Sequence, residues 1–326
     1  MLPIEARQDA TIVTLATAEV LEQRLHERLL CGQLPDAYLY VGRGASNWLA
    51  LEHSPAFDVA SSLTELLRQN VASLVPLLPE GLELLSIGVG EGLKERILLR
   101  SLASTACKRY LPVDVSEQLV EAALSTVADL DLPKLGIVAF AEDLPSLRQY
   151  RQGPSLLCLL GNNFSNYQPE ELLAILSKEM DAADYLLFDS HLCPDGIADP
   201  EQWRRSVEAV YRQEQNADFN LSPLVERGVP RENCRFRLDL LHLPSMQGPV
   251  YRTVKQIEIL RDCVTVVGGR PVALHAGEHI EMGFTYKYRA KQVEGHLHEK
   301  GFTVVWKASS SGGENAIFLC RKEKGQ

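Results

Sequence analysis

The stretch Leu84-Leu-Ser-Ile-Gly-Val-Gly-Glu-Gly-Leu-Lys94 is the part of the chain that decides its fold. An apolar run stops at three glycines on alternate positions, Gly88, Gly90 and Gly92, and a helical pattern follows. This order predicts a buried strand, a tight turn and a helix. Glycine permits positive φ and close approach of a ligand, and a helix start presents free N–H groups. We therefore expect a nucleotide-like cofactor at the turn.

The spacing of the glycines distinguishes two kinds of cofactor. A dinucleotide fingerprint places its third glycine three residues after the second, where this chain has Leu93. Glycine at every second position is typical instead of S-adenosylmethionine (SAM) methyltransferases. A plain strand-to-helix turn is the structural alternative, because short glycine-rich matches have many false positives. The pattern that follows in the chain favours a cofactor.

The composition is that of an ordinary soluble globular protein. The chain has 326 residues, 45% of them hydrophobic and 23% charged, which suits one large domain or two smaller ones. The formal net charge of -10 gives no reason to expect nucleic acid as a partner. Seven scattered cysteines without C-x-x-C spacing, and no signal-like or membrane-length apolar run, predict a cytoplasmic protein. The oligomeric state is not predicted.

Strand and helix patterns alternate after the glycine turn. Four further apolar segments are expected to be strands: 110–113, 136–141, 155–160 and 185–189. This alternation predicts a doubly wound α/β sheet, whose ligands bind at the carboxyl ends of the strands. After a helix over 291–300, the segments 302–307 and 316–321 predict a hairpin at the edge of the sheet.

Polar residues at the strand ends are candidate ligand-binding groups. Asp114 follows the glycines at about the distance of the acid that binds a ribose hydroxyl in nucleotide-binding βαβ units. A carboxylate there can accept hydrogen bonds from both ribose hydroxyls. A capping or turn aspartate is the structural alternative. The other polar residues at strand ends are Glu142, Asp143, Asn162, Asn166 and Asp189.

The alternation breaks between Leu192 and Phe284. This block has a helical segment near 202–215 and two strand-like pieces of alternating character, 235–243 and 251–260. Such a block is too long for a connection, because loops between elements of one domain are usually short. It therefore predicts a second subdomain.

Five short segments occur in an order that resembles the histidine-specific SAM-dependent methyltransferases. That group includes the ergothioneine-pathway enzyme that trimethylates the α-amino group of histidine, and fungal enzymes acting on tryptophan-type amines are similar. The segments are the glycine turn with Lys94, Pro112-Val-Asp-Val-Ser116, Leu160-Gly-Asn-Asn-Phe-Ser-Asn166, Phe219-Asn-Leu-Ser-Pro-Leu224 and Thr285-Tyr-Lys-Tyr288. Each motif is short, but their joint order from about Leu34 onward is specific.

The resemblance implies a class I SAM methyltransferase fold, a doubly wound and mostly parallel sheet with an antiparallel edge strand. Together with the break in alternation, it predicts the SAM-binding domain in residues 60–191 and 284–326. A second α+β domain, for substrate binding, is expected in residues 1–59 and 192–283. The implied cofactor is SAM and the implied partner is a small-molecule amine or amino acid, without nucleic acid or membrane.

The resemblance also implies roles for single residues. Those expected at the cofactor are Gly88, Gly90, Lys94, Asp114, Glu142, Asp143, Gly161 and Asn162, with Glu142 and Asp143 near the adenine. Those expected at the substrate are Tyr40, Asn166, Phe219, Gly283 and Thr285, with Asn166 and Tyr40 as catalytic candidates. Asn166 suits orientation, because its carbonyl can accept from an amine without stabilising the ammonium as a carboxylate would. A turn asparagine and core aromatics are the structural alternatives.

The chain departs from this family at three places. The acid that usually opens the glycine motif is Ser86 here, and a tyrosine-rich segment is replaced by Glu52-His-Ser-Pro-Ala-Phe57. The acid that reads the imidazole, and the serine two residues later, appear as Gly283 and Thr285. A site built to hydrogen-bond a ring N–H discriminates strongly through that partner. Its loss argues against histidine as substrate, unless Glu281 substitutes for it.

These observations predict a SAM-dependent N-methyltransferase acting on the amino group of an amino acid or related small amine, and not on plain histidine. A catalytically inert SAM-binding or scaffold protein is one alternative, and an NAD-dependent enzyme on the same sheet is another, disfavoured by Leu93. His275 and His279 have i,i+4 spacing, but an intervening glycine and the lack of a clear third ligand predict no metal site.

Overall fold

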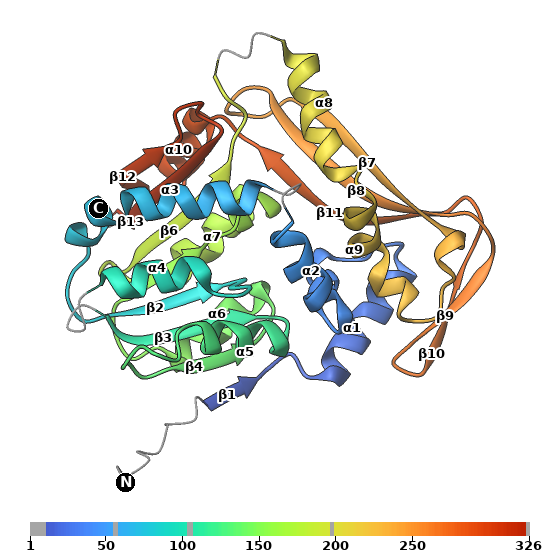
Figure 1. Cartoon of the computed structure of the whole chain (residues 1–326), viewed down its shortest axis with the longest axis horizontal. Coiled ribbons are helices and arrows are strands. Elements are labelled where there is room, and N and C mark those ends of the chain that lie inside the picture. The colour runs from blue at the N-terminus through green and yellow to red at the C-terminus, as the bar shows by residue number, and fades with distance from the viewer. Residues whose placement is uncertain (1–10, 55–57, 103–106, 196–198, 324–326) are drawn as a thin grey trace.

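One large sheet organises the computed structural model, which describes residues 11–54, 58–102, 107–195 and 199–323. Its eight strands follow the order β1-β4-β3-β2-β5-β6-β13-β12 (Figure 1). They are β1 (Thr11–Thr14), β2 (Leu82–Ile87), β3 (Cys107–Asp114), β4 (Leu135–Val138), β5 (Ser155–Leu159), β6 (Tyr185–His191), β12 (Phe302–Ser309) and β13 (Asn315–Lys322). The strands from β1 to β6 pair in parallel, and β13 is antiparallel to both neighbours. The predicted sheet and its edge hairpin are confirmed.

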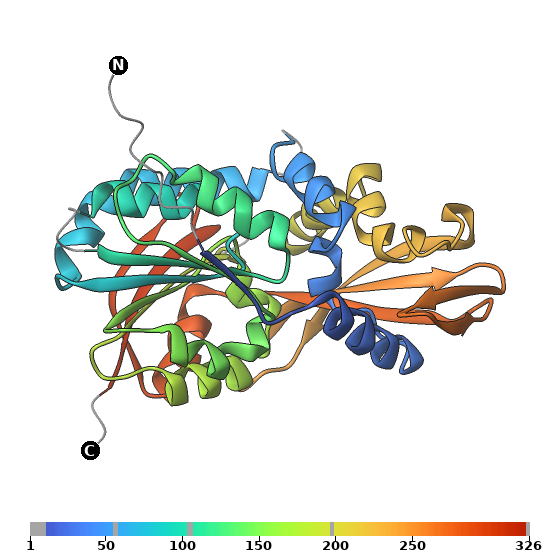
Figure 2. The same ribbon diagram turned by 90° about the horizontal axis from the view of Figure 1, so that it is seen from below.

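Helices cover both faces of this sheet (Figure 2). One face carries α3 (Asp58–Leu74), α4 (Leu93–Ser101) and α5 (Glu117–Thr126), and the other carries α6 (Leu144–Leu147), α7 (Pro169–Glu179) and α10 (Ala290–Glu299). Strand β2 shows why both faces are needed. Leu82 and Leu84 belong to the apolar cluster on the first face, whereas Leu85 and Ile87 belong to the cluster on the second. Successive side chains of a strand point to opposite faces, so a strand that is apolar throughout is buried between two layers.

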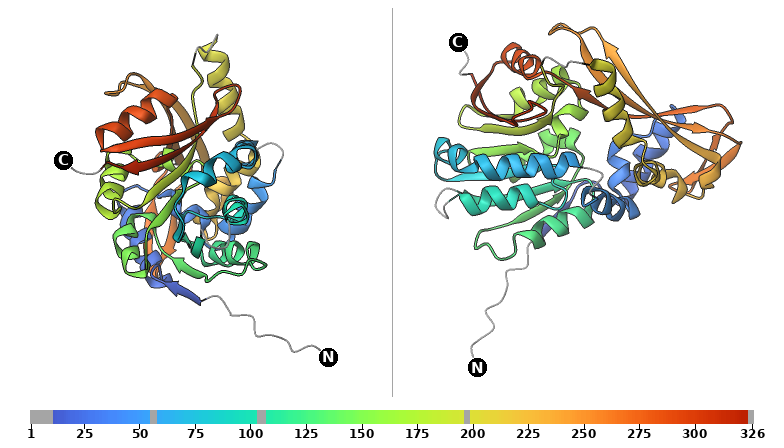
Figure 3. Two further views of the ribbon diagram at one scale, coloured as in Figure 1. Left: turned by 90° about the vertical axis from the view of Figure 1, so that its left-hand side faces the viewer. Right: turned by 45° about the horizontal axis from the view of Figure 1, so that its top comes forward.

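A smaller part of the chain lies beyond the carboxyl ends of the parallel strands (Figures 1 and 3). Its three-stranded antiparallel sheet has the order β11-β8-β7, and a separate hairpin pairs β9 with β10. These strands are β7 (Cys234–Leu243), β8 (Val250–Ile259), β9 (Cys263–Val267), β10 (Arg270–Leu274) and β11 (His279–Lys287). The helical elements are α1 (Ala18–Leu30), the short turn η1 (Asp36–Tyr40), α2 (Arg43–Glu52), α8 (Pro200–Tyr211) and α9 (Glu214–Val225). The predicted α+β character is confirmed.

Two strands depart from the expected domain division. β1 comes from the segment expected in the second domain, yet it pairs with β4 at the edge of the large sheet. β11 pairs with β8 from His279 to Lys287 and so runs across the boundary between 283 and 284. The two-domain division otherwise stays a prediction. Among the described residues, no helix is long and apolar enough to cross a membrane.

Candidate active site

A cavity of about 510 Å³ lies where the ends of the parallel strands meet the smaller part. Its size is within the usual range for a small-molecule site. Except for Asp143 and Asp189, all the predicted site residues line it: Tyr40, Gly88, Gly90, Lys94, Asp114, Glu142, Gly161, Asn162, Asn166, Phe219, Gly283 and Thr285. Asp143 instead accepts a hydrogen bond from Arg24 over 3.2 Å. The tertiary structure therefore brings the expected cofactor and substrate residues into one cavity.

The glycine turn needs residues without side chains. Gly88, Gly90 and Gly92 have φ values of 66°, 57° and 77°, in the left-handed region. A Cβ added at Gly88 would lie 2.6 Å from Nδ2 of Asn163, whereas one at Gly90 would meet only Nε1 of Trp48, at 3.8 Å. The backbone at Gly90 thus borders open cavity, and a ligand can approach it closely.

Asp114 ends β3 beside this turn. Its carboxylate accepts hydrogen bonds from the amide of Gly90 over 3.2 Å and from that of Ser116 over 3.1 Å. Burial raises the pKa of Asp114 to about 6, although the backbone hydrogen bonds oppose that shift. At neutral pH the group is mainly ionised, with acceptor capacity left for hydroxyl groups in the cavity.

A second turn, after β5, is held by a carboxylate from β6. The amides of Gly161 and Asn162 donate to Asp189 over 3.0 and 2.6 Å. Asn162 has a φ of 64°, and its Oδ1 accepts from the amide of His191 over 2.8 Å. Asp189 is therefore a positioning residue that sets the turn against the end of β6.

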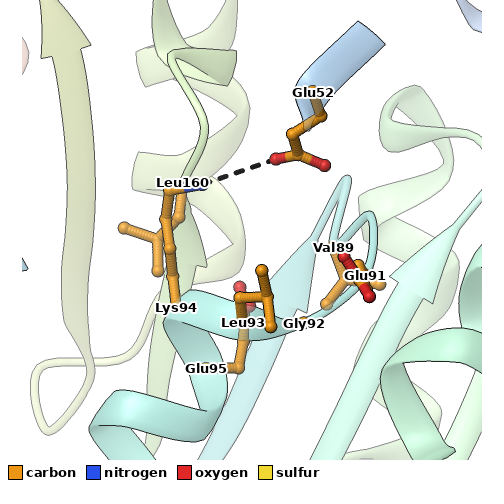
Figure 4. Close-up of a pocket in the computed structure, with 8 residues that line it drawn as sticks. All are labelled: Glu52, Val89, Glu91, Gly92, Leu93, Lys94, Glu95 and Leu160. Atoms are coloured by element: carbon orange, nitrogen blue, oxygen red, sulfur yellow. Dashed lines mark ion pairs between the residues drawn. The ribbon is translucent and has the colours of Figure 1, made fainter. Parts of the chain in front are cut away.

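An ion pair joins the two parts of the chain above the glycine turn. Nζ of Lys94, in the first turn of α4, lies 4.0 Å from Oε1 of Glu52 at the end of α2 (Figure 4). Burial raises the pKa of Glu52, and its Oε2 is buried without a hydrogen-bond partner. Glu52 lines the cavity. It begins the departing segment 52–57, of which residues 55–57 lie outside the described residues.

The missing acid at the start of the glycine motif has a local replacement. The hydroxyl of Ser86 donates to Oε1 of Glu95 over 2.6 Å, and both side chains are buried. Burial raises the pKa of Glu95. A carboxyl group therefore lies beneath the turn, supplied by α4 and not by β2.

Three aromatic side chains that line the cavity pack together, and two of them, Tyr40 and Phe219, are residues expected at the substrate. The ring of Tyr40 lies 5.3 Å from that of Trp48 and 5.6 Å from that of Phe219, between centroids. Burial raises the pKa of Tyr40 well above its usual value. Tyr40 therefore remains a neutral phenol, which can donate or accept a hydrogen bond but is no phenolate base near neutral pH.

Asn166 ends the short turn η5 (Asn163–Asn166). Its Oδ1 accepts a hydrogen bond from the hydroxyl of Thr285 over 2.8 Å. A carbonyl oxygen has two lone pairs, so one remains to accept from a ligand. Thr285, expected only as a pocket residue, thus also orients the amide of Asn166.

Several charged residues of the cavity were missed from the sequence, among them Asp36, Lys255 and Lys287. Nζ of Lys255 lies 2.6 Å from Oδ2 of Asp36. Lys287 is 2% exposed, and burial lowers its pKa to about 8. The sequence held one signal for Lys255. On β8 it alternates with Thr253, Ile257 and Ile259, which are all buried on the same face of the strand, so a lysine there is unusual. Lys287 is the third residue of the motif Thr285-Tyr-Lys-Tyr288, and no sequence pattern marks it as a site residue.

The two histidines of the metal alternative lie apart from this cavity. Nδ1 of His275 is 3.9 Å from Asp262, and Nδ1 of His279 is 3.3 Å from Oε1 of Gln256. Within the described ranges, no group of three or more His, Cys, Asp or Glu residues is arranged to hold a metal ion.

The cavity's cofactor side fits a nucleoside. Asp114 offers a carboxylate for ribose hydroxyls, and Gly90 offers a backbone that a ligand can approach. Apolar side chains also line the cavity, and Val115, Leu119 and Phe140 among them are suited to a flat base. An apolar surface with a few polar groups at its edge is the usual setting for such a ligand.

The chain is similar to several known proteins. Over 216 residues the chain is 26% identical to the N-methyltransferase fsqC of Aspergillus fumigatus, a match that covers 64% of this chain and 57% of that protein. A solved structure from Bordetella parapertussis is 14% identical with a TM-score of 0.49, covering 94% of this chain and 87% of that one. SAM-bound CalS10, an amino pentose methyltransferase of Micromonospora echinaspora, is 10% identical with a TM-score of 0.39, covering 85% and 95%. Structural similarity at this level carries no further argument.

The family match spans almost the whole chain. Residues 17–322 match the sequence model of the family described as "Histidine-specific methyltransferase, SAM-dependent". That range contains both sides of the cavity, from Tyr40 to Thr285. The description names SAM, which agrees with the glycine spacing and disagrees with the NAD alternative. The chain belongs to the family of histidine-specific, SAM-dependent methyltransferases.

Proposed function

We propose that this protein is a SAM-dependent N-methyltransferase that methylates the amino group of an amino acid. One observation carries the proposal: a single cavity combines the cofactor residues with an amide, Asn166, and a buried cation, Lys287. SAM, when bound, supplies an electrophilic methyl group on a sulfonium. Gly88, Gly90 and Asp114 would hold it, with Glu142 near the adenine.

Asn166 would orient the amine. In-line transfer depends on holding the reacting atoms in near-attack geometry, which is the main contribution a protein can make here. Thr285 holds the amide of Asn166 so that one lone pair of Oδ1 remains for an N–H group of the substrate. The amine must react in its unprotonated form. A neutral amide suits that requirement, because it does not favour the ammonium as a carboxylate would.

Lys287 would bind the carboxylate of the substrate. Among the described residues, no carboxylate opposes the lowering of the pKa of Lys287 by burial. A buried charge is costly unless it is paired. Lys287 stands two residues after Thr285 on β11, which places their Cα atoms roughly 7 Å apart. A substrate held at Asn166 by its amine can therefore reach Lys287 with an adjacent carboxylate.

The test uses purified protein, methyl-labelled SAM, and L-amino acids matched with their decarboxylated amines. We expect at least one L-amino acid to be methylated, with a KM about tenfold or more below that of its amine. Lys287→Met removes this difference, whereas Lys291→Met, a lysine on the exposed side of α10, preserves it. Equal use of the two acceptors by the unmodified protein would contradict the role of Lys287.

Two further outcomes decide the class of the protein. Binding of S-adenosylhomocysteine without labelling of any amine would replace the enzyme by the inert SAM-binding alternative. Failure to bind S-adenosylhomocysteine would contradict both the enzyme and the inert SAM-binding alternative. Calorimetry of the cofactor product and mass spectrometry of the acceptors separate these cases.

We also propose that the protein works in the cytoplasm with a small molecule as its partner. All seven cysteines are free in the structure, as is usual in a reducing compartment. The net charge of -10 disfavours nucleic acid. Cell fractionation with a tagged chain tests the location.

A further inference from the structure

The missing side chain at position 283 leaves a space that another residue fills. Gly283 lies at a β-bulge of β11, where the pairing with β8 shifts between Glu281 and Phe284. Its amide donates to Oδ1 of Asp36 over 3.1 Å. A Cβ built on Gly283 would overlap the carboxylate of Asp36. The carboxylate therefore occupies the place where a side chain at 283 would begin.

Asp36 is held there by its backbone. The amide of Leu34 donates a hydrogen bond to the carbonyl oxygen of Glu281 over 2.8 Å. The amide of Glu281 donates in turn to the carbonyl oxygen of Gly32, also over 2.8 Å. These bonds align the segment before η1 with β11, so Asp36 emerges beside the bulge. The side chain of Glu281 is exposed. Glu281 also lines the cavity, but the carboxylate of Asp36 is the one that accepts from the amide of Gly283, so Asp36 is better placed to supply the missing acid.

Lys255 completes a charge pair with Asp36. It lies on β8 between Val254 and Gln256, which pair with Phe284 and Glu281, so it stands opposite the bulge. Its Nζ is 2.6 Å from Oδ2 of Asp36, and the side chains are 10% and 22% exposed. Both residues line the cavity. This wall of the cavity therefore offers a donor and an acceptor together, without net charge.

We propose that the Asp36–Lys255 pair selects the side chain of the substrate, an aromatic ring bearing an uncharged group that both donates and accepts hydrogen bonds. A phenol and a neutral imidazole share this chemistry. The inference rests on the proposed function, which places the amine at Asn166. A purely apolar ring would leave Asp36 and Lys255 without ligand partners, which costs binding energy. A charged side chain would be attracted by one member of the pair and repelled by the other, so it gains no net electrostatic advantage there.

The aromatic part of the inference rests on the neighbouring rings. Tyr40 belongs to the same short turn as Asp36, and its ring packs on Trp48 and Phe219. All of these residues line the cavity. Rings that meet edge to face bind a further aromatic ring favourably. Histidine is compatible with this site, because the carboxylate of Asp36 lies near position 283.

Calorimetry with L-tyrosine, L-histidine and L-phenylalanine tests the pair, with the whole chain saturated with S-adenosylhomocysteine. Tyrosine and phenylalanine differ by one hydroxyl. We expect tyrosine, histidine or both to bind about tenfold or more tighter than phenylalanine. The inference would be overturned if phenylalanine bound as tightly as both tyrosine and histidine. It would also be overturned if neither tyrosine nor histidine bound.

Asp36→Asn keeps the shape of the side chain and removes its charge. We expect the preference over phenylalanine to fall to within about threefold, with phenylalanine binding itself little changed. If Asp36 had a purely structural role, the variant would bind all three amino acids more weakly by the same factor. That result would overturn the inference. Asp181→Asn is the matched control, because Asp181 pairs with Arg148 over 3.0 Å on the surface.

Gly283→Glu tests whether the two positions compete for one space. Alone, it forces a side chain against Asp36, and we expect the preference for tyrosine or histidine to be lost. Combined with Asp36→Ala, the new carboxylate has room opposite Lys255, and we expect the preference to return at least in part. Normal binding by the single variant, or no recovery in a folded double variant, would overturn the inference.

The results of these binding measurements distinguish a failure of the Asp36–Lys255 inference from a failure of the proposed function. Amino-acid binding next to S-adenosylhomocysteine requires no methyl transfer. Pair-dependent binding without labelling would refute the enzyme and leave the pair as a ligand-selecting element. Methyl transfer without discrimination between tyrosine, histidine and phenylalanine would refute the pair alone.

Discussion

The hydroxyl of Thr285 donates a hydrogen bond to Oδ1 of Asn166 over 2.8 Å, across a sequence separation of 119 residues. Asn166 belongs to the turn η5 beside the large sheet, and Thr285 belongs to β11 of the smaller sheet. The bond therefore ties the two sides of the cavity together. It also orients the one amide that we propose for binding the amine.

Thr285→Val removes this bond while keeping the shape of the side chain. A hydrogen bond of this kind contributes about 1 kcal/mol, so we expect kcat to fall about fivefold to tenfold. Binding of S-adenosylhomocysteine stays unchanged. Thr285→Ser retains the hydroxyl and serves as the control, with steady-state kinetics as the measurement. An unchanged kcat for the valine variant would show that Asn166 needs no support.

The affinity for the cofactor should depend on pH through Asp114. Burial raises the pKa of this group to about 6, and only the ionised form accepts hydrogen bonds from both ribose hydroxyls. Protonation therefore removes acceptors as the pH falls below 6. We expect the Kd for S-adenosylhomocysteine to rise about tenfold between pH 7 and pH 5.

Asp114→Asn isolates this effect from other titrating groups. At pH 7 the variant should bind S-adenosylhomocysteine at least about tenfold more weakly than the unmodified protein does. Its Kd should no longer change between pH 7 and pH 5. Calorimetry at the two pH values is the measurement. A pH dependence that survives in Asp114→Asn would mean that another group titrates.

Gly90→Ala should impair the cofactor site more than the fold. Placing alanine at a φ of 57° costs about 1 to 2 kcal/mol of stability, and the new methyl group points into the cavity near Trp48. Gly269→Ala is the matched control, because Gly269 has a φ of 74° with no atom within 4 Å of an added Cβ. We expect similar losses in melting temperature, but weaker S-adenosylhomocysteine binding only for Gly90→Ala. Equal binding by both variants would place the ligand away from Gly90.

The buried pair Ser86–Glu95 should be sensitive to the side chain at position 86. Ser86→Ala leaves a buried carboxyl oxygen without its donor, which costs about 1 to 3 kcal/mol. Ser86→Asp should cost more, because it places a second acid beside Glu95. The swap Ser86→Asp with Glu95→Ser should recover part of that loss. Urea unfolding gives these free energies, and a neutral Ser86→Ala would show that Glu95 finds another donor.

The large sheet was predictable because its signals are local. β2 is apolar on both faces and ends at three glycines, so strand, turn and helix all appear within a short stretch. The places of Asp114 and Asn166 in the fold were predictable for the same reason, because Asp114 ends β3 and Asn166 ends the turn that follows β5. β1 was missed, since four residues are too few to establish a period, and it is recognised only by its pairing with β4.

The amino-acid sequence by itself determined the sheet and the glycine turn and predicted the residues expected at the cofactor, because backbone conformation and strand periodicity act over a few residues. Only the tertiary structure decided the substrate side. Asp36 and Lys255 are 219 residues apart, and no local pattern relates a turn near the N-terminus to the inner row of β8. Their meeting depends on Gly283 being small enough to admit a carboxylate, and on backbone pairing that brings residues 32–34 alongside β11.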